Sequence, residues 1–175
     1  MDQVLLVEDD VPTREWLAEV LSAMETAGVL VDRAGIEARI PHHGAMCLLH
    51  ELVACDAREL RCRVVSHADA AHPLRSHGAL PAVAGIELAS QAMALHGALN
   101  APALAPPRAG FLASARSVRL HVARLDDAPG PLVVHVVHLA GDATQALYAF
   151  DLSDAAARLL VEGRLAVVLD AGALK

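Results

Sequence analysis

Residues 80–99 read LPAVAGIELASQAMALHGAL, and this stretch decides the fold of the chain. Pro81 suits the first turn of a helix, where its missing N–H group is not needed. Apolar and small residues recur after it at three- and four-residue spacing, as in Ile86, Ala89 and Met93. The pattern predicts one long, slim and mostly buried helix.

Two polar side chains, Glu87 and Gln91, lie four residues apart and therefore on one face of this helix. A carboxylate on an otherwise buried helix is costly unless it has a partner or a chemical task. A surface helix with a solvated Glu87 fits the same periodicity. Glu87 is therefore a candidate functional residue, and the periodicity alone leaves both interpretations open.

The composition favours a single folded domain in the cytoplasm. The chain has 175 residues, 55% of them hydrophobic, and a net charge of −7 that argues against nucleic-acid binding. No apolar run reaches the length of about 18 residues that a membrane-spanning helix needs. The N-terminus is acidic where a signal peptide would be basic, and Cys47, Cys55 and Cys62 are expected to be free thiols in a reducing compartment.

The other elements are predicted to surround the long helix. A short helix begins at residue 32 or 33 and ends before Pro41. Strands are expected at residues 46–53, 59–66, 118–123, 132–139, 146–152 and 159–169. Short turns between strands favour antiparallel pairing, and a lone apolar helix must be covered by the sheet. The predicted fold class is α+β, a hotdog fold with an antiparallel sheet wrapped around one long central helix.

The N-terminal stretch MDQVLLVEDDVPTREWLAEVLSA, residues 1–23, differs in pattern from the rest of the chain. It resembles the start of a response-regulator receiver domain, in which a buried strand ends in an acidic pair, here Asp9 and Asp10, that helps to bind Mg²⁺. The later hydroxyl and lysine of that family are not found, so no phosphotransfer is expected. We divide the chain into an N-terminal extension, residues 1–31, and a hotdog domain, residues 32–175.

Three motifs, IPHHGAMCLLHELV, HPLRSHGALPAVAGIELASQAMALHG and GFLASARSVRLHV, resemble the hotdog-fold 3-hydroxyacyl-ACP dehydratases. Within them the chain is most similar to the ApeP-like branch associated with aryl polyene synthesis. The resemblance implies dehydration of 3-hydroxyacyl thioesters in polyene or fatty-acid-like chain synthesis, with no cofactor and no metal. It implies two kinds of partner: acyl carrier protein with its phosphopantetheine arm, and a second hotdog subunit in a homodimer or heterodimer. A hotdog acyl thioesterase and a non-catalytic partner subunit stay open as alternatives.

The resemblance also assigns site residues. The family uses a histidine in the loop before the helix and an acid on the helix. The match of IELASQA to its helix motif places the acid at Glu87 and the following glutamine, which would fix the Glu87 rotamer, at Gln91. The family spacing places the histidine beside His72, with His77 and then His67 as the alternatives.

The chemistry explains these residue types. A neutral imidazole suits removal of the α-proton, and Glu87 could protonate or orient the leaving hydroxyl group. Amide groups at the start of the helix, near Ala84 and Gly85, are predicted to bind the thioester oxygen as negative charge develops on it.

Other polar residues receive simpler interpretations. His42 and His43 lie between Pro41 and Gly44, have no recognised metal-ligand spacing and are interpreted as turn or active-site-loop residues. His96 is expected to end the central helix. Five arginines are candidates for binding the phosphate of a carrier arm or the acidic carrier itself: Arg61, Arg63, Arg75, Arg108 and Arg116.

Overall fold

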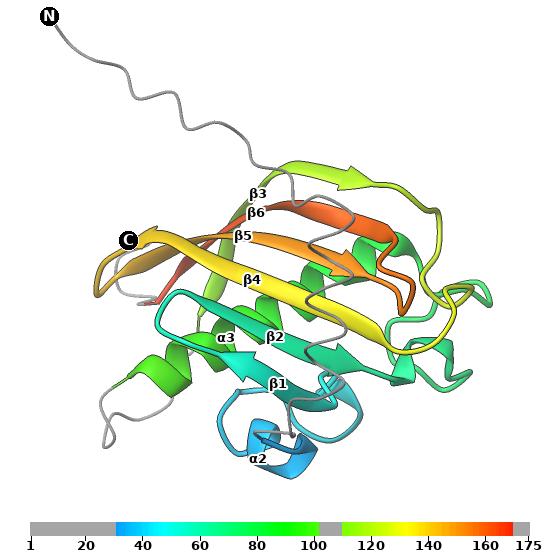
Figure 1. Cartoon of the computed structure of the whole chain (residues 1–175), viewed down its shortest axis with the longest axis horizontal. Coiled ribbons are helices and arrows are strands. Elements are labelled where there is room, and N and C mark those ends of the chain that lie inside the picture. The colour runs from blue at the N-terminus through cyan, green and yellow to red at the C-terminus, as the bar shows by residue number, and fades with distance from the viewer. Residues whose placement is uncertain (1–30, 102–109, 170–175) are drawn as a thin grey trace, which may run out of the picture.

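The computed structural model describes residues 31–101 and 110–169, which form a six-stranded antiparallel sheet with a long helix on one face (Figure 1). The helices are α2 (Arg33–Glu37) and α3 (Gly85–Asn100), with 3-10 turns η1 (Gly44–Met46), η2 (Ser66–Ala68) and η3 (Ala82–Ala84). The strands are β1 (Glu51–Cys55), β2 (Glu59–Val64), β3 (Phe111–Leu120), β4 (Leu132–Gly141), β5 (Gln145–Ser153) and β6 (Leu159–Val168). The receiver-like stretch lies outside the described residues.

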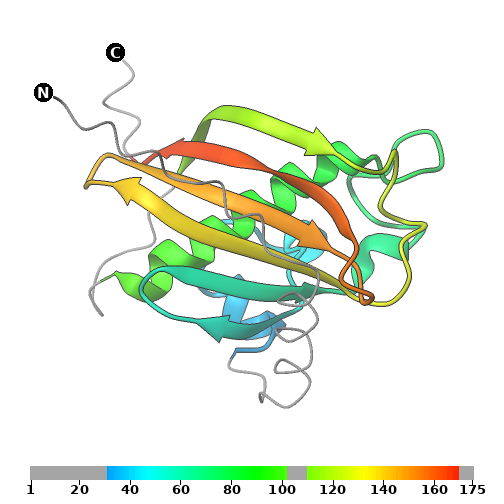
Figure 2. The same ribbon diagram turned by 45° about the horizontal axis from the view of Figure 1, so that its top comes forward.

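The strand order is β1-β2-β4-β5-β6-β3. Strands β4, β5 and β6 follow one another through short turns, whereas α3 and β3 intervene in sequence between the neighbours β2 and β4. The chain therefore leaves the sheet after β2, crosses it as α3 and returns at the opposite edge as β3. Figure 2 shows the sheet curving over the helix. This arrangement confirms the predicted hotdog fold.

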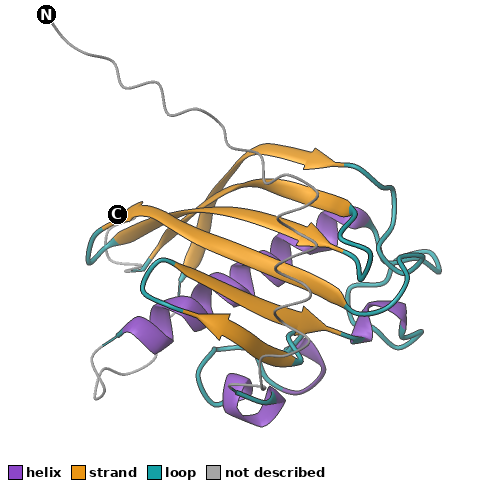
Figure 3. Cartoon of the chain, viewed as in Figure 1, coloured by secondary structure: helices purple, strands orange, loops and turns teal. Residues whose placement is uncertain are grey.

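The core lies between α3 and the concave face of the sheet, and Figure 3 shows the helix running across that face. Leu88 and Leu95 of α3 and Leu60 and Val134 of the sheet are all fully or almost fully buried. Burial of each leucine side chain contributes about 1.5–3 kcal/mol to stability. Gly85 lets the helix start come close to the sheet, because an added Cβ would lie 3.2 Å from side-chain atoms of both Leu152 and Val161.

Two strand predictions need correction. The stretch predicted as a strand over 46–53 is η1 and an irregular segment up to residue 50, and β1 occupies Glu51–Cys55 instead. At the other edge β3 begins at Phe111, well before the predicted start at 118. Most of β3 is solvent-exposed, so the alternation that marks a half-buried strand is weak there. A bulge near Ser117, whose φ is +52°, interrupts its register further.

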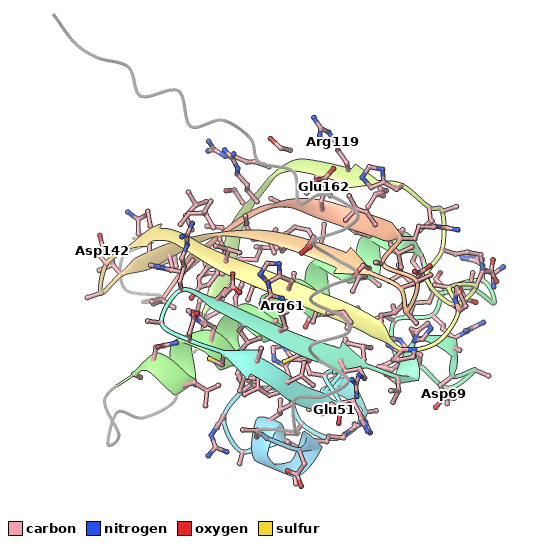
Figure 4. All side chains as sticks on the ribbon, in the orientation of Figure 1. Glu51, Arg61, Asp69, Arg119, Asp142 and Glu162 are labelled. Carbon is pink, nitrogen blue, oxygen red and sulfur yellow. The ribbon has the colours of Figure 1, made fainter. Side chains whose placement is uncertain are left out.

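The convex face of the sheet, away from α3, is charged. Arg61 lies between two side chains that point to the core, so it projects from the convex face, where it is seen in Figure 4. It forms an ion pair with Glu59, and His135 bridges Glu59 and Asp151. No helix within the described ranges is long and apolar enough to cross a membrane.

Candidate active site

The first turn of α3 brings a carboxylate and an imidazole together. His42 Nε2 lies 3.1 Å from Glu87 Oε1, and each side chain is about one-third exposed, at 30% and 33%. His42 comes from the segment of residues 41–46, here called the His42 turn, which comes after α2. Glu87 therefore points neither into the closed core nor entirely into bulk solvent, but toward a histidine 45 positions earlier in the chain.

Gln91, one turn further along α3, binds both Glu87 and the backbone just after His42. Its amide nitrogen donates to Glu87 Oε1 at 3.0 Å and to the carbonyl oxygen of Met46 at 2.8 Å. Its amide oxygen accepts from the backbone N–H of Leu48 at 2.9 Å. Gln91 is fully buried, with protein partners for both ends of its amide, so the side chain ties Glu87 to the segment just after His42.

The pair leaves two polar atoms without protein partners. Among the described residues, Glu87 bonds to His42 and Gln91 through Oε1, and its Oε2 has no hydrogen bond or ion pair. With Glu87 ionised, Nε2 of His42 must be the donor, which makes Nδ1 of a neutral ring an acceptor. That Nδ1 is buried and has no hydrogen-bond partner in the described part of the chain. The site thus has one carboxylate oxygen free to bind a ligand and the other bound to an imidazole.

The contacts that the structure shows for the three loop histidines are with groups other than Glu87. His72 is buried, and its Nδ1 accepts from Leu74 N at 3.2 Å, while burial lowers its pKa. His67 is buried as well, with Nε2 3.1 Å from Ala128 O. His77 is exposed and contacts Ser76 Oγ. Within the described protomer none of the three pairs with Glu87, and their catalytic role stays a prediction.

The backbone amides predicted to bind a thioester oxygen already have acceptors. Ala84 N donates to Pro81 O at 2.9 Å, and Gly85 N donates within η3, because a 3-10 turn precedes the α-helix. Both residues are buried. A part for Ala84 and Gly85 in substrate binding stays a prediction.

Asp126 secures the start of the helix segment. Its carboxylate accepts from Leu80 N at 2.9 Å, forms an ion pair with Arg75 at 3.0 Å and binds the Arg124 guanidinium. The hydrogen bond from Arg124, followed by the one from Leu80, holds the pKa of Asp126 well below its usual range. These contacts fix the loop between β3 and β4 against the chain that enters η3.

Most of the predicted carrier-binding arginines have ion-pair partners in the fold. Arg61, Arg63 and Arg75 pair with Glu59, Glu51 and Asp126 respectively. Arg108 lies outside the described residues. Arg116 is exposed on the edge strand β3, which makes it the described candidate best placed to meet a partner.

The arrangement can perform proton transfer. Within residues 31–101 and 110–169, no group of three or more His, Cys, Asp or Glu side chains is placed to hold a metal ion. His42 could not be identified from the sequence as the partner of Glu87, because a contact over 45 positions leaves no periodic signal. The available signal was its place in PHHGAM, one of the motifs on which the family resemblance rested.

The comparisons with known proteins agree on the fold. A family model described as ApeP dehydratase matches residues 34–173. The solved dehydratase heterocomplex ApeI:P from Xenorhabdus doucetiae is similar with a TM-score of 0.65 and 22% identity, over 77% of this chain and 90% of that one. Zebra fish thioesterase superfamily member 2 is similar with a TM-score of 0.53 and 15% identity, over 90% of this chain and 99% of that one. No curated protein matches the chain.

Proposed function

Because the chain belongs to the ApeP dehydratase family, we propose that it dehydrates 3-hydroxyacyl chains carried on acyl carrier protein, during polyene or fatty-acid-like chain synthesis. The observation that carries the proposal is the unequal hydrogen bonding of the two carboxylate oxygens of Glu87. One carboxylate oxygen is bound by His42 and Gln91. The other has no hydrogen-bond partner within residues 31–101 and 110–169, on a side chain that is 33% exposed.

This pair suits the proton balance of dehydration. The reaction removes a proton from the α-carbon, forms the α,β double bond and releases the β-hydroxyl group as water after adding a proton to it. One proton is taken and one is returned, so a carboxyl–imidazole pair that shares a proton between Oε1 and Nε2 is regenerated in each cycle. Glu87 Oε2 is the atom that would face the acyl chain, and His42 would balance its charge.

The edge strand β3 is the proposed contact with a second hotdog subunit. An edge strand presents unpaired backbone groups to any strand that can align with it. Phe111, Leu112 and Leu120 of β3 are each about half exposed, so the same edge offers apolar side chains. The ApeI:P structure is a heterocomplex, which favours a non-identical partner, although a homodimer would use the same edge. His72 and His77 are the candidates for a contribution from one subunit to the site of the other.

A cytoplasmic location fits this proposal. Cys47, Cys55 and Cys62 are free thiols, of which two are buried. Burial raises the pKa of Cys47 and Cys55, so these are packing residues rather than activated nucleophiles. Free thiols are the usual state in a reducing compartment.

The test is an assay of the full chain, alone and with a hotdog partner, on a 3-hydroxyacyl thioester of acyl carrier protein. Formation of the enoyl thioester, followed by its absorbance, is the expected result. Release of free thiol without enoyl product would instead identify a thioesterase. Inactivity of the chain alone and in the complex, with rescue of the partner's own activity on mixing, would identify a non-catalytic subunit and refute the proposal.

A further inference from the structure

Two side chains of α2 hold the His42 turn at Gly44. Glu37 Oε1 accepts the backbone N–H of Gly44 at 2.6 Å, and Arg33 Nη2 donates to the carbonyl oxygen of Gly44 at 2.8 Å. Arg33 and Glu37 are four residues apart, so they lie on one face of the short helix. The fully buried Ile36 seats that helix on the core. Both peptide groups that flank the Cα of Gly44 are therefore fixed from the same side.

The same segment is held by α3 through Gln91, which binds Met46 O and Leu48 N. Gly44 itself has a φ of +58°, a conformation that glycine adopts without strain and that other residues avoid. The chain that carries His42 is thus fixed between two helices, at a glycine that would otherwise be among its most flexible points.

This matters because the His42–Glu87 contact is not enclosed by the core. Both side chains are about one-third exposed, so water competes for their hydrogen-bonding atoms. The contact persists only if the backbone of the His42 turn is kept in place. We propose that Arg33 and Glu37 are positioning residues, which act through Gly44 to hold His42 against Glu87. The expected effect on turnover rests on the proposed function, whereas the effect on the His42 ring does not.

A merely structural role for α2 gives different expectations. In that case loss of either side chain would lower the stability of the whole domain and leave His42 unchanged in the folded fraction. Arg39 provides a matched control, since it also binds the backbone of α2, donating to Gly35 O at 2.6 Å, but does not contact the His42 turn.

The experiment compares four variants in the full chain: Glu37→Ala, Glu37→Gln, Arg33→Met and Arg39→Ala. Each is assayed for enoyl formation, and the NMR chemical shifts of the His42 ring nitrogens are recorded without substrate. A displacement of about 1 Å at a reacting group can cost up to about 100-fold in rate. We expect Glu37→Ala and Arg33→Met to lower kcat about 10-fold with little change in KM, and to shift the His42 resonances. Glu37→Gln keeps an oxygen acceptor and should restore both readouts, and Arg39→Ala should match the unaltered chain.

The outcomes distinguish the positioning role of Arg33 and Glu37 from the proposed dehydratase function. Unchanged His42 resonances in either Glu37→Ala or Arg33→Met would overturn the positioning role of the residue concerned, whatever happens to kcat. Equal shifts in Arg39→Ala would overturn it too, since the effect would then be general to α2. If the unaltered chain makes no enoyl product while the His42 resonances still move in both Glu37→Ala and Arg33→Met and return in Glu37→Gln, the positioning role stands and the proposed function fails.

Discussion

Helix α3 carries a polar cluster at each end, and the two clusters differ in how completely their atoms are hydrogen-bonded. At the C-terminal end, His96 Nε2 lies 3.0 Å from Asp56 O, and Nδ1 lies 2.9 Å from Tyr148 Oη. Because a carbonyl oxygen only accepts, Nε2 is the donor and Nδ1 accepts the proton of the tyrosine hydroxyl. His96 is only 2% exposed, and both of its ring nitrogens are paired.

At the N-terminal end, the cluster of His42, Glu87 and Gln91 is incomplete. Gln91 is fully paired, but Glu87 Oε2 and His42 Nδ1 have no partner among the described residues. A buried network that satisfies every member serves rigidity and a single packing arrangement. An open acceptor on a side chain that is one-third exposed instead leaves room for a ligand atom. We therefore expect the C-terminal end of α3 to serve stability and the N-terminal end to serve the proposed chemistry.

The largest expected effect is on turnover and comes from Glu87→Gln. The variant removes the ionisable oxygen while keeping the size of the side chain, so proton transfer is lost and folding is kept. General acid–base groups contribute about 100- to 10,000-fold to rate, and we expect kcat to fall within that range. Enoyl absorbance measures the rate, and a thermal unfolding midpoint equal to that of the unaltered chain checks the fold. Full activity would remove Glu87 from the mechanism and with it the contrast between the two ends.

Gln91→Leu should lower both stability and activity, because this residue joins the chemistry to the core. The variant leaves the buried Leu48 N and the partly buried Met46 O without the Gln91 side chain as a partner, at about 1–3 kcal/mol for a fully buried group such as Leu48 N. It also frees Glu87, so kcat should fall. Ser90→Ala is the control on the same helix, since Ser90 Oγ bonds only to Ile86 O within α3. Denaturant unfolding that shows no difference between the two variants would contradict the role given to Gln91.

Tyr148→Phe should show the opposite pattern to Glu87→Gln. Burial raises the pKa of Tyr148 to about 12, so its hydroxyl is a constant donor at ordinary pH. Its removal leaves His96 Nδ1 buried and unpaired, which should cost about 1–3 kcal/mol of unfolding free energy. The kcat for dehydration should stay unchanged, since Tyr148 lies at the other end of α3. A loss of kcat without a loss of stability would reverse the assignment of the two clusters.

The helix and its local pairings could be predicted because they depend only on nearby residues. Pro81 and the apolar spacing predict helix ends that lie within a few residues of the observed start of η3 and end of α3. The contact between Gln91 and Glu87, four residues apart, follows from helical geometry alone and is present at 3.0 Å. The hotdog arrangement followed from one apolar helix among antiparallel strands.

The partners of His42 and His96 could not be predicted in the same way. His42 meets Glu87 only because the His42 turn passes through a positive φ at Gly44 and is bound by Gln91. His96 was expected to end the helix, but α3 continues to Asn100 and the ring is buried against Tyr148, 52 positions later. Contacts of this range are set by the final packing of the sheet on the helix, which leaves no period in the sequence.

The smallest expected effect is on the pH dependence of the unfolding free energy, when His96 is replaced by glutamine, which does not ionise. Burial lowers the pKa of His96 below its ordinary value of about 6.5. Just below that pH the unfolded chain is therefore protonated at His96 while the folded chain is not. The resulting stability is complete above about pH 6.5 and is lost as the pH falls through the folded-state pKa, with a slope of at most about 1.4 kcal/mol per pH unit. His72, whose pKa burial also lowers, adds to the same slope. Urea unfolding between about pH 7.5 and 5 should therefore give a shallower slope for His96→Gln than for the unaltered chain, although not a flat one. An unaltered slope would mean that protons reach His96 without unfolding, and the C-terminal cluster would then be as open as the one around Glu87.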